Sequence, residues 1–289
     1  MRKVMVVIVN WNGKKDTLEC LGSLKNVSII VVDNASFDGS VEAIRKQFPK
    51  VEIIQNSENL GFTGGNNVGI KNALNDGADF VWLLNNDTTV DKNALMSLIN
   101  VFDDASVGVA GSKIYFSADR EFHKDRYKKS ELGNVLWYAG GLIDWQNMYA
   151  SHRGVDEVDH GQYDQLEETP FITGCSMMVK KEVFEKIGFL DEKFFAYLED
   201  LDFCLRAKSA GYKLLYVPRS IVWHKNASAS GVGSDTHQYY MTRNRLLVGM
   251  RYAPLRTKIA LLKEGMRFTF LRRRAYFDAL LGRYGKQNI

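Results

Sequence analysis

The chain has 289 residues, of which 45% are hydrophobic and 25% are charged, a composition typical of globular proteins. The sequence contains no run of about 18 apolar residues that would cross a membrane, and the apolar stretch after residues 1–3 is too short for the core of a signal peptide. The net charge of +4 is unevenly divided, because residues 236–289 hold nine arginines and three lysines against two acids and so carry +10, which leaves −6 for the rest. Such a division indicates either a partner for the tail or a solvated helix surface.

Strand-like and helix-like segments alternate over roughly the first hundred residues. We expect strands at 4–9, 29–32, 51–54 and 80–84, a loop at 61–65, and helices at 16–24, 40–48, 66–74 and 92–102. The strand segments are continuous apolar runs rich in Val and Ile, as in strands that are buried on both faces. This alternation predicts an α/β fold with a mostly parallel central sheet flanked by helices.

The pattern loosens after residue 107, where a charged excursion at 117–130 precedes a glycine-rich, aromatic section. We expect helices at 181–187 and 200–210, short strands at 212–217 and 221–223, and a hinge of small residues at 228–234. The basic tail that follows is helical by composition, with apolar and cationic faces.

The cysteines are Cys20, Cys175 and Cys204, an odd number without the spacing of a metal site. We expect all three to be buried, reduced side chains in a cytosolic protein.

Polar residues end the predicted strands, where an open α/β sheet binds its ligands. Asn10 ends the first strand and Asp33 the second, and Trp11 follows Asn10 with an aromatic ring. A dehydrogenase needs Gly-x-Gly-x-x-Gly after the first strand, but residues 10–13 read Asn-Trp-Asn-Gly, so the sequence excludes a nicotinamide site of this type. Nucleotide recognition without a glycine turn remains, and so does an ordinary turn at Asp33.

Two further segments offer candidate ligand contacts. The glycines of 59–67 would let backbone amides approach an anion or a sugar, or would form a tight loop with a helix cap. Residues 85–88, Asn-Asn-Asp-Thr, offer oxygen ligands suited to Mg²⁺ or Mn²⁺ bridging a diphosphate, or form a polar turn.

An acidic cluster, Glu199-Asp200-Leu201-Asp202, opens a predicted helix. The helix dipole favours acids in a first turn by roughly 0.3–1 kcal/mol each, which accounts for Asp202 but less easily for three neighbouring acids. A carboxylate beside a diphosphate is a candidate general base. His224 ends a strand and is either a neutral metal ligand or a structural histidine.

Taken in order, these motifs resemble family 2 glycosyltransferases with the GT-A fold, over roughly residues 4–245. The segments that carry the resemblance are 7–12, 32–40, 59–62, 65–66, 84–87, 174–177 and 199–206. Within the family, Asn-Asn-Asp at 85–87, Trp223-His224, Tyr239-Tyr240 and Arg243-Asn244 are most similar to bacterial rhamnosyltransferases of polysaccharide assembly. Residues 199–206 and His224 also resemble galactofuranosyltransferases.

The resemblance implies a role for each matching residue. Asp200 would be the catalytic base, and Asp87 and His224 would bind the divalent metal, Mg²⁺ or Mn²⁺. The donor would lie along Asn10, Asp33, Gly65, Asn66 and Asn86, and the acceptor near Gly174, Cys175 and Glu199. The usual Asp-x-Asp metal motif reads Asn85-Asn86-Asp87 here, so the first acid is missing.

The resemblance also implies a domain organisation. Residues 1–235 would form the glycosyltransferase domain, with a nucleotide-binding half at about 1–110 and an acceptor half at about 111–235, and residues 236–289 a basic amphipathic helical tail.

The predicted reaction is an inverting transfer from a nucleotide diphosphate sugar (dTDP or UDP) to a hydroxyl of a glycan or lipid-linked acceptor in cell-surface polysaccharide synthesis. Rhamnose from dTDP-rhamnose is the first choice, and a galactofuranosyl or other UDP-hexose transfer is the alternative. A nucleotidyltransferase would need a basic glycine-rich loop after the first strand, of which residues 12–15 are a poor version. A sugar-nucleotide-binding protein without catalysis would not need Asp87 together with Glu199 and Asp200.

The tail places Arg272-Arg273-Arg274 among aromatic and aliphatic residues, a pattern that suits an anionic membrane face. We therefore predict a cytoplasmic protein that lies peripherally on the inner face of the cell membrane. Formation of a homo-oligomer through the apolar face of the tail is the competing use. Charge alone would allow a nucleic-acid partner, and since no other feature supports one, none is predicted.

Overall fold

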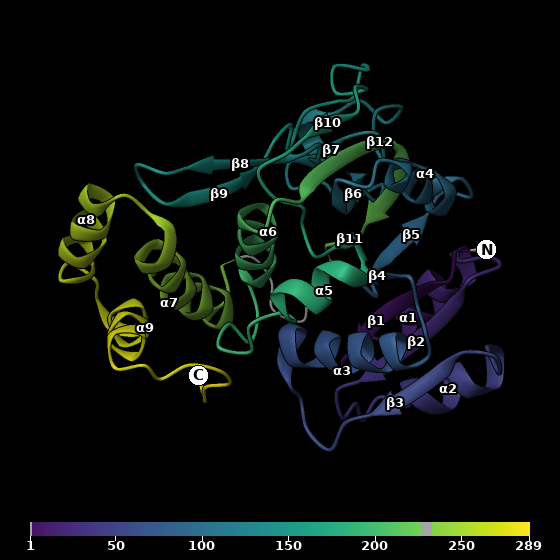
Figure 1. The fold of residues 1–289 in the computed structure, drawn as a ribbon, viewed down its shortest axis with the longest axis horizontal. Coiled ribbons are helices and arrows are strands. Elements are labelled where there is room, and N and C mark those ends of the chain that lie inside the picture. The colour runs from purple at the N-terminus through teal and green to yellow at the C-terminus, as the bar shows by residue number, and fades with distance from the viewer. Residues whose placement is uncertain (1, 227–232) are drawn as a thin grey trace.

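The computed structural model describes residues 2–226 and 233–289, so most of the predicted hinge at 228–234 lies outside the described residues. A central sheet with helices on both sides forms the body of the molecule, and three further helices lie beside it (Figure 1). The predicted α/β architecture with a C-terminal helical extension is confirmed.

The sheet has the strand order β10-β12-β6-β11-β4-β1-β2-β3. Its main strands are β1 (Val4–Asn10), β2 (Ser28–Asp33), β3 (Glu52–Gln55), β4 (Phe80–Leu84), β6 (Val107–Phe116), β11 (Ser176–Lys180) and β12 (Lys213–His224). Strands β1 to β4 pair in parallel, as do β6 and β12, whereas β11 runs antiparallel to both β4 and β6. Strands β6 and β12 therefore run in the same direction as β1 to β4, and the carboxyl ends of all six share an edge with the start of β11.

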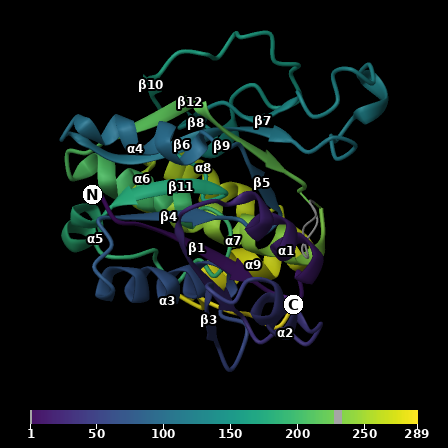
Figure 2. The ribbon, with the colours of Figure 1, turned by 90° about the vertical axis from the view of Figure 1, so that its right-hand side faces the viewer.

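Short strands extend the sheet at the end away from β3 (Figure 2). These are β5 (Thr88–Val90) and β10 (Glu167–Glu168), which pair with β12, and β7 (Leu136–Tyr138), which pairs with β6. A separate hairpin consists of β8 (Gly141–Asp144) and β9 (Tyr149–His152). The sequence did not predict these elements, because runs of two to four residues carry little periodicity.

The predicted helices of the body are present, with their ends shifted by a few residues. They are α1 (Lys14–Ser23), α2 (Ser40–Gln47), α3 (Gly61–Asn75), α4 (Ala94–Asn100), α5 (Lys181–Ile187) and α6 (Glu199–Ser209). Single 3₁₀ turns follow at Val101–Asp103 and, within the charged excursion, at Lys124–Arg126.

Two sequence predictions were wrong. The loop predicted at 61–65 is the start of α3, where a β-carbon on Gly65 would stand 2.8 Å from Val9 Cγ1. Glycine thus lets the helix lie close to β1, rather than forming a loop. The two short strands predicted at 212–217 and 221–223 are one strand, β12, whose pairing with β6 continues across a register shift between Val217 and Ile221.

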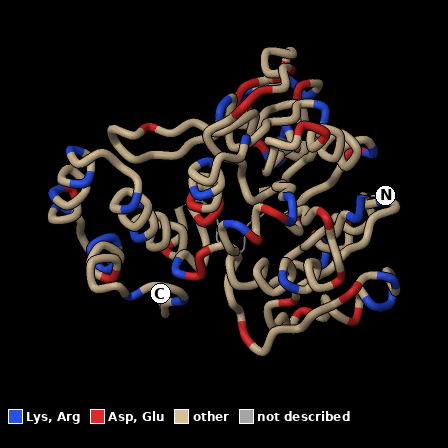
Figure 3. Tube along the Cα trace, viewed as in Figure 1, with Lys and Arg blue, Asp and Glu red and all other residues tan. Residues whose placement is uncertain are grey.

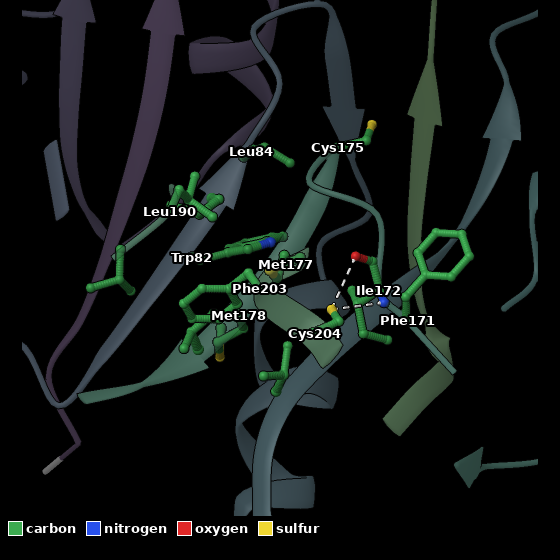
Figure 4. Close-up of a cluster of buried hydrophobic side chains, with 14 of the residues drawn as sticks. Trp82, Leu84, Phe171, Ile172, Cys175, Met177, Met178, Leu190, Phe203 and Cys204 are labelled. Carbon is green, nitrogen blue, oxygen red and sulfur yellow. Dashed lines mark hydrogen bonds between the residues drawn. The ribbon is translucent and has the colours of Figure 1, made fainter. Parts of the chain in front are cut away.

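Trp82 lies at the centre of the core below the shared sheet edge, among Met177, Met178 and Phe203 (Figure 4). Its indole Nε1 donates a hydrogen bond to Ser176 Oγ over 3.0 Å, so the one polar atom of this side chain is satisfied. The cysteines are buried and unpaired, as expected. This packing fixes β4 and β11 as neighbours, and with them the residues that follow β4 and precede β11.

The C-terminal helices are α7 (Asp235–Tyr252), α8 (Leu255–Gly265) and α9 (Phe270–Leu280). The β8–β9 hairpin reaches toward them in Figure 1, and Arg245 and Thr257 bond to backbone carbonyls of residues 145–148 at its tip. Helix α7 buries eight residues, Arg243 and Asn244 among them, so it is part of the body as well as the first helix of the tail. Within the described part of the chain, no helix combines the length and the hydropathy needed to cross a bilayer.

Candidate active site

The predicted site residues gather at the shared edge of the sheet. Asn10 and Asp33 are paired in register at the ends of β1 and β2, and His224 ends β12. The segment after β4 meets the segment before β11, because the amide of Asn85 donates to the carbonyl of Cys175 over 3.0 Å. The direction of the strands therefore brings together residues that are more than 200 positions apart in the sequence.

Asn10 and Asp33 are fully buried and bind each other. Asn10 Nδ2 donates to Asp33 Oδ1 over 2.7 Å, and the other oxygen, Asp33 Oδ2, accepts from the Ser36 amide over 2.9 Å. Asn10 Oδ1 accepts from Thr17 Oγ1 over 2.7 Å. These bonds fix the turns after β1 and β2, while the neighbouring Trp11 side chain is 42% exposed and available for stacking.

The other predicted donor residues also make internal contacts. Asn86 Nδ2 donates to Thr17 Oγ1 over 3.0 Å, and Asn66 Nδ2 donates to the carbonyl of Phe62 over 2.9 Å. Gly65 packs against β1. Thr17, which joins Asn10 to Asn86, was not predicted from the sequence, because a threonine within a helix gives no signal of such a role.

Asp87 and His224 are in direct contact, with Asp87 Oδ1 and His224 Nε2 separated by 3.0 Å, and both are buried. Trp137, a second residue that the sequence did not reveal, packs its ring edge to face on His224 with centroids 4.5 Å apart. His152 contacts the same indole, and burial lowers the pKa of His152 to about 4, so that imidazole is neutral at physiological pH.

One carboxylate and one imidazole make an incomplete set of metal ligands, and no group of three or more such side chains is found among the described residues. Mg²⁺ and related ions are commonly held by one or two carboxylates together with substrate phosphates. His224 Nδ1 is buried and has no hydrogen-bond partner among the described residues, so no hydrogen bond to this nitrogen fixes the orientation of the ring. The pair fits an ion that arrives with a diphosphate.

Glu199 and Asp200 begin α6 beside the start of β11. Asp200 Oδ2 accepts from the Gly174 amide over 2.9 Å and Oδ1 accepts from the Leu201 amide over 2.8 Å, yet burial still raises the pKa of this carboxyl. Glu199 is 5% exposed, and burial, reinforced by the charge of Asp200, raises its pKa well above the usual range. The charge of Asp200 therefore opposes the ionisation of Glu199.

Asp202 differs from its two neighbours. Its carboxylate accepts bonds from Arg206 over 2.9 Å, Arg251 over 2.6 Å and Tyr252 over 2.8 Å, and it is fully buried. The structural interpretation of this acid is confirmed, and its partners join α6 to α7.

The start of α6, with its acidic residues, and the Asp87–His224 pair thus lie at one edge of the sheet. The chain belongs to glycosyltransferase family 2, whose model matches residues 5–188. Asp200, His224 and the C-terminal helices lie beyond the matched segment.

Three relatives have related descriptions. The low-salt glycan biosynthesis hexosyltransferase Agl10 of Haloferax volcanii is 27% identical over 207 residues, which cover 70% of this chain and 61%, less than two thirds, of that protein. The dTDP-rhamnosyl transferase RfbF of Shigella flexneri is 25% identical and covers 87% of this chain and 82% of its own. The N-acetylglucosaminyl-diphospho-decaprenol L-rhamnosyltransferase of Mycobacterium tuberculosis is 24% identical, and the match covers 75% of this chain and 72% of that protein.

Solved structures agree on the fold. A mannosyltransferase from Pyrobaculum calidifontis, in complex with GDP-Man and Mn²⁺, has a TM-score of 0.57 at 15% identity, over 97% of this chain and 74% of its own. TarS 1–349 from S. aureus, in complex with UDP, has a TM-score of 0.57 at 16% identity. The match covers 96% of this chain and 79% of the TarS chain.

Proposed function

We propose that this protein is an inverting, metal-dependent glycosyltransferase that moves a sugar from a nucleotide diphosphate sugar to a hydroxyl of a glycan or lipid-linked acceptor. The observation that carries the proposal is the placement of Asp200. Its carboxylate bonds to Gly174, next to Cys175, whose carbonyl bonds to Asn85 at the start of the segment that leads to Asp87. A half-buried carboxylate with a raised pKa thus lies near the candidate diphosphate site, as a general base requires.

In the proposed reaction Asp200 removes the proton of the acceptor hydroxyl while that oxygen forms a bond to the anomeric carbon of the donor. The bond from the anomeric carbon to the diphosphate breaks, and the diphosphate leaves with the electron pair. Attack from the side opposite the leaving group inverts the configuration. General-base assistance of this kind contributes roughly 10²–10⁴-fold to a rate.

Asp87 and His224 are the residues that would hold Mg²⁺ or Mn²⁺. The ion would offset the negative charge on the departing diphosphate. The wall of the donor pocket would be supported by Asn10, Asp33, Asn66 and Asn86. Their side chains bond to other groups of the protein. Glu199, Gly174 and Cys175 would line the acceptor side.

For the donor we propose dTDP-rhamnose, since the descriptions of two relatives name rhamnosyl transfer and one of them names dTDP. Galactofuranose or another hexose on UDP is the alternative. A thermal-shift panel of dTDP-rhamnose, UDP-galactofuranose, UDP-galactose, UDP-N-acetylglucosamine and GDP-mannose, each with Mn²⁺, tests this. Stabilisation by dTDP-rhamnose alone is expected, and stabilisation only by a UDP sugar would replace it with the alternative.

The activity itself is tested by incubating the protein and Mn²⁺ with the donor selected by the panel, alone and with polyprenyl-diphosphate sugar acceptors. Slow donor hydrolysis that becomes transfer when acceptor is added is the expected result. Tight donor binding with neither hydrolysis nor transfer would instead indicate a sugar-nucleotide-binding protein.

We further propose a cytoplasmic protein whose tail contacts the anionic inner face of the cell membrane. Cationic residues outnumber acidic ones along α7, α8 and α9 (Figure 3). The exposed face of α9 and the residue after it combine apolar Phe270 (92% exposed), Phe277 and Leu281 with Arg273 and Arg274. This mixture suits an anionic lipid surface.

Co-sedimentation with phosphatidylglycerol-containing vesicles tests the membrane contact. We expect binding at low salt that weakens at high salt, because the attraction is screened. A stable dimer in solution that does not bind vesicles would assign the same face to self-association.

A further inference from the structure

The segment that leads into α6 has a costly backbone. Phe195, Tyr197 and Leu198 have φ angles of 64°, 69° and 67°, in the left-handed region that residues with a side chain rarely adopt. Leu198 is the residue immediately before α6, so this conformation sets where Glu199 and Asp200 stand. We call residues 193–198 the base-carrying loop.

Two buried side chains of α7 hold this loop. Arg243 Nη2 donates to the carbonyls of Lys193 and Phe194 over 2.8 and 2.7 Å. Asn244 Nδ2 donates to the carbonyls of Phe194, Ala196 and Tyr197 over 3.1, 2.7 and 2.8 Å. Four carbonyls of six consecutive residues are thus bound by one guanidinium and one carboxamide.

The two side chains also fix each other. Arg243 Nε donates to Asn244 Oδ1 over 3.0 Å, which orients the carboxamide with its NH₂ group toward the loop. Arg243 Nη1 donates to the carbonyl of Gly285 over 2.7 Å. Both side chains are fully buried, in a position where an apolar residue would fill the space but would leave the loop carbonyls without donors.

The opposite side of the loop is equally constrained. Phe195 stacks on Tyr240 of α7 with ring centroids 5.0 Å apart, and its carbonyl accepts from the Thr63 amide at the start of α3 over 3.1 Å. The loop is therefore held between α3, which follows β3, and α7.

We propose that Arg243 and Asn244 are positioning residues that hold the base-carrying loop so that Asp200 meets the acceptor hydroxyl. The inference rests on the proposed function, since it takes Asp200 as the base. It assigns to the C-terminal region a part in the transfer step that is separate from any contact with lipid.

The test compares Arg243→Lys and Asn244→Asp with the control Arg245→Met. Lysine cannot span the two carbonyls that the planar guanidinium reaches, and a carboxylate cannot donate to any. Arg245 lies on the same helix but bonds to the hairpin tip at Met148 and Asn147 and to Glu264, not to the loop.

Displacing the base by about an ångström is expected to lower kcat by roughly tenfold to a hundredfold. The donor dissociation constant should stay within about twofold, because the donor-side strand ends are untouched. The acid limb of the pH profile of kcat should also move, since the surroundings of Asp200 change. Arg245→Met should show none of these three effects.

Combining these changes with Asp200→Asn distinguishes a positioning role from a general loss of stability. In Asp200→Asn, the added Arg243→Lys or Asn244→Asp change should have almost no further effect on transfer, because the group being positioned is gone. An equal further loss of kcat in that background would overturn the proposal. So would normal kcat in both variants alongside a lowered melting temperature.

Failure of the proposed function has a different signature. If Asp200→Asn alone transfers at the wild-type rate, the base assignment fails and the positioning role fails with it. If Asp200→Asn is inactive while Arg243→Lys and Asn244→Asp transfer normally, only the positioning role fails. Asn244→Ser, which keeps a small polar group, serves as a milder variant should the others not fold.

Discussion

The two sides of the candidate site are built in opposite ways. At the ends of β1 and β2, both oxygens of Asp33 accept hydrogen bonds, and Asn10 is bonded in turn to Asp33 and Thr17. At the start of α6, Glu199 Oε2 is buried without a partner among the described residues, and the backbone before it is left-handed. Costly features of this kind persist where function requires them. The comparison favours a scaffold role for the ends of β1 and β2 and, under the proposed function, a chemical role for the start of α6.

The sharpest test of the comparison is Asp200→Asn. We expect transfer to fall by roughly 10²–10⁴-fold while the donor still binds, because only the proton acceptor is lost. In the wild type, kcat should fall as the pH drops through the raised pKa of Asp200, above the usual aspartate range. Single-turnover transfer and donor binding by calorimetry measure the two effects. Turnover like that of the wild type would remove Asp200 from the mechanism.

Metal removal should have the next largest effect. Exhaustive chelation is expected to lower transfer by roughly a hundredfold, with recovery on addition of Mg²⁺ or Mn²⁺, since several kcal/mol of charge stabilisation are lost. Asn85→Asp, which restores the missing acid, should reduce the Mn²⁺ concentration for half-maximal activity by about threefold to tenfold. Full activity after chelation would contradict the assignment of Asp87 and His224.

Asp33→Ala tests the scaffold side. The change leaves Asn10 Nδ2 and the Ser36 amide without a shared partner, and it should lower the free energy of unfolding by about 1–3 kcal/mol. Glu42→Ala, at an exposed position of α2, is the control and should change it by less than about 0.5 kcal/mol. Denaturant unfolding measures both. Unchanged stability together with lost donor binding would make Asp33 a direct ligand and would break the comparison.

Glu199→Gln should have the smallest effect, and one that depends on pH. Because burial raises the pKa of Glu199 above the unfolded value of about 4.3, the native state binds more protons between the two values, and the free energy of unfolding falls as the pH rises through that window. Glutamine removes this penalty, so the variant should gain stability over the wild type from pH 5 to pH 8 and gain little at pH 4. Melting temperatures across that range measure it, and a constant difference would show that Glu199 is already satisfied.

Much of the sheet was predictable, because Val4–Asn10 and Phe80–Leu84 are continuous apolar runs that end in polar residues. The pairing of Asp87 with His224 was expected only from the family resemblance, and the structure brings the two side chains into contact. The start of α3 was missed, because its glycines read as a loop while their actual use is close packing on β1.

The positioning role of Arg243 and Asn244 could not be predicted from the sequence. Arg243 and Asn244 stand in a basic segment whose composition indicates a solvated helix face, and only the tertiary structure shows that both are buried. Trp137 is a similar case, since its contact with His224 depends on the pairing of β7 with β6 and of β12 with β6.

The bonds from α7 to the base-carrying loop also bear on how the protein matures as the ribosome releases it. Strands β1 to β4 emerge within the first third of the chain and can pair at once, but the carbonyls of residues 193–197 meet their donors only after Arg243 and Asn244 have emerged. Arg243 is in turn held by the carbonyl of Gly285. A nascent chain, or one cleaved after α6, would therefore contain every strand end of the donor side and still lack a fixed base. Transfer would begin only after α7 and Gly285 have emerged and docked on this loop.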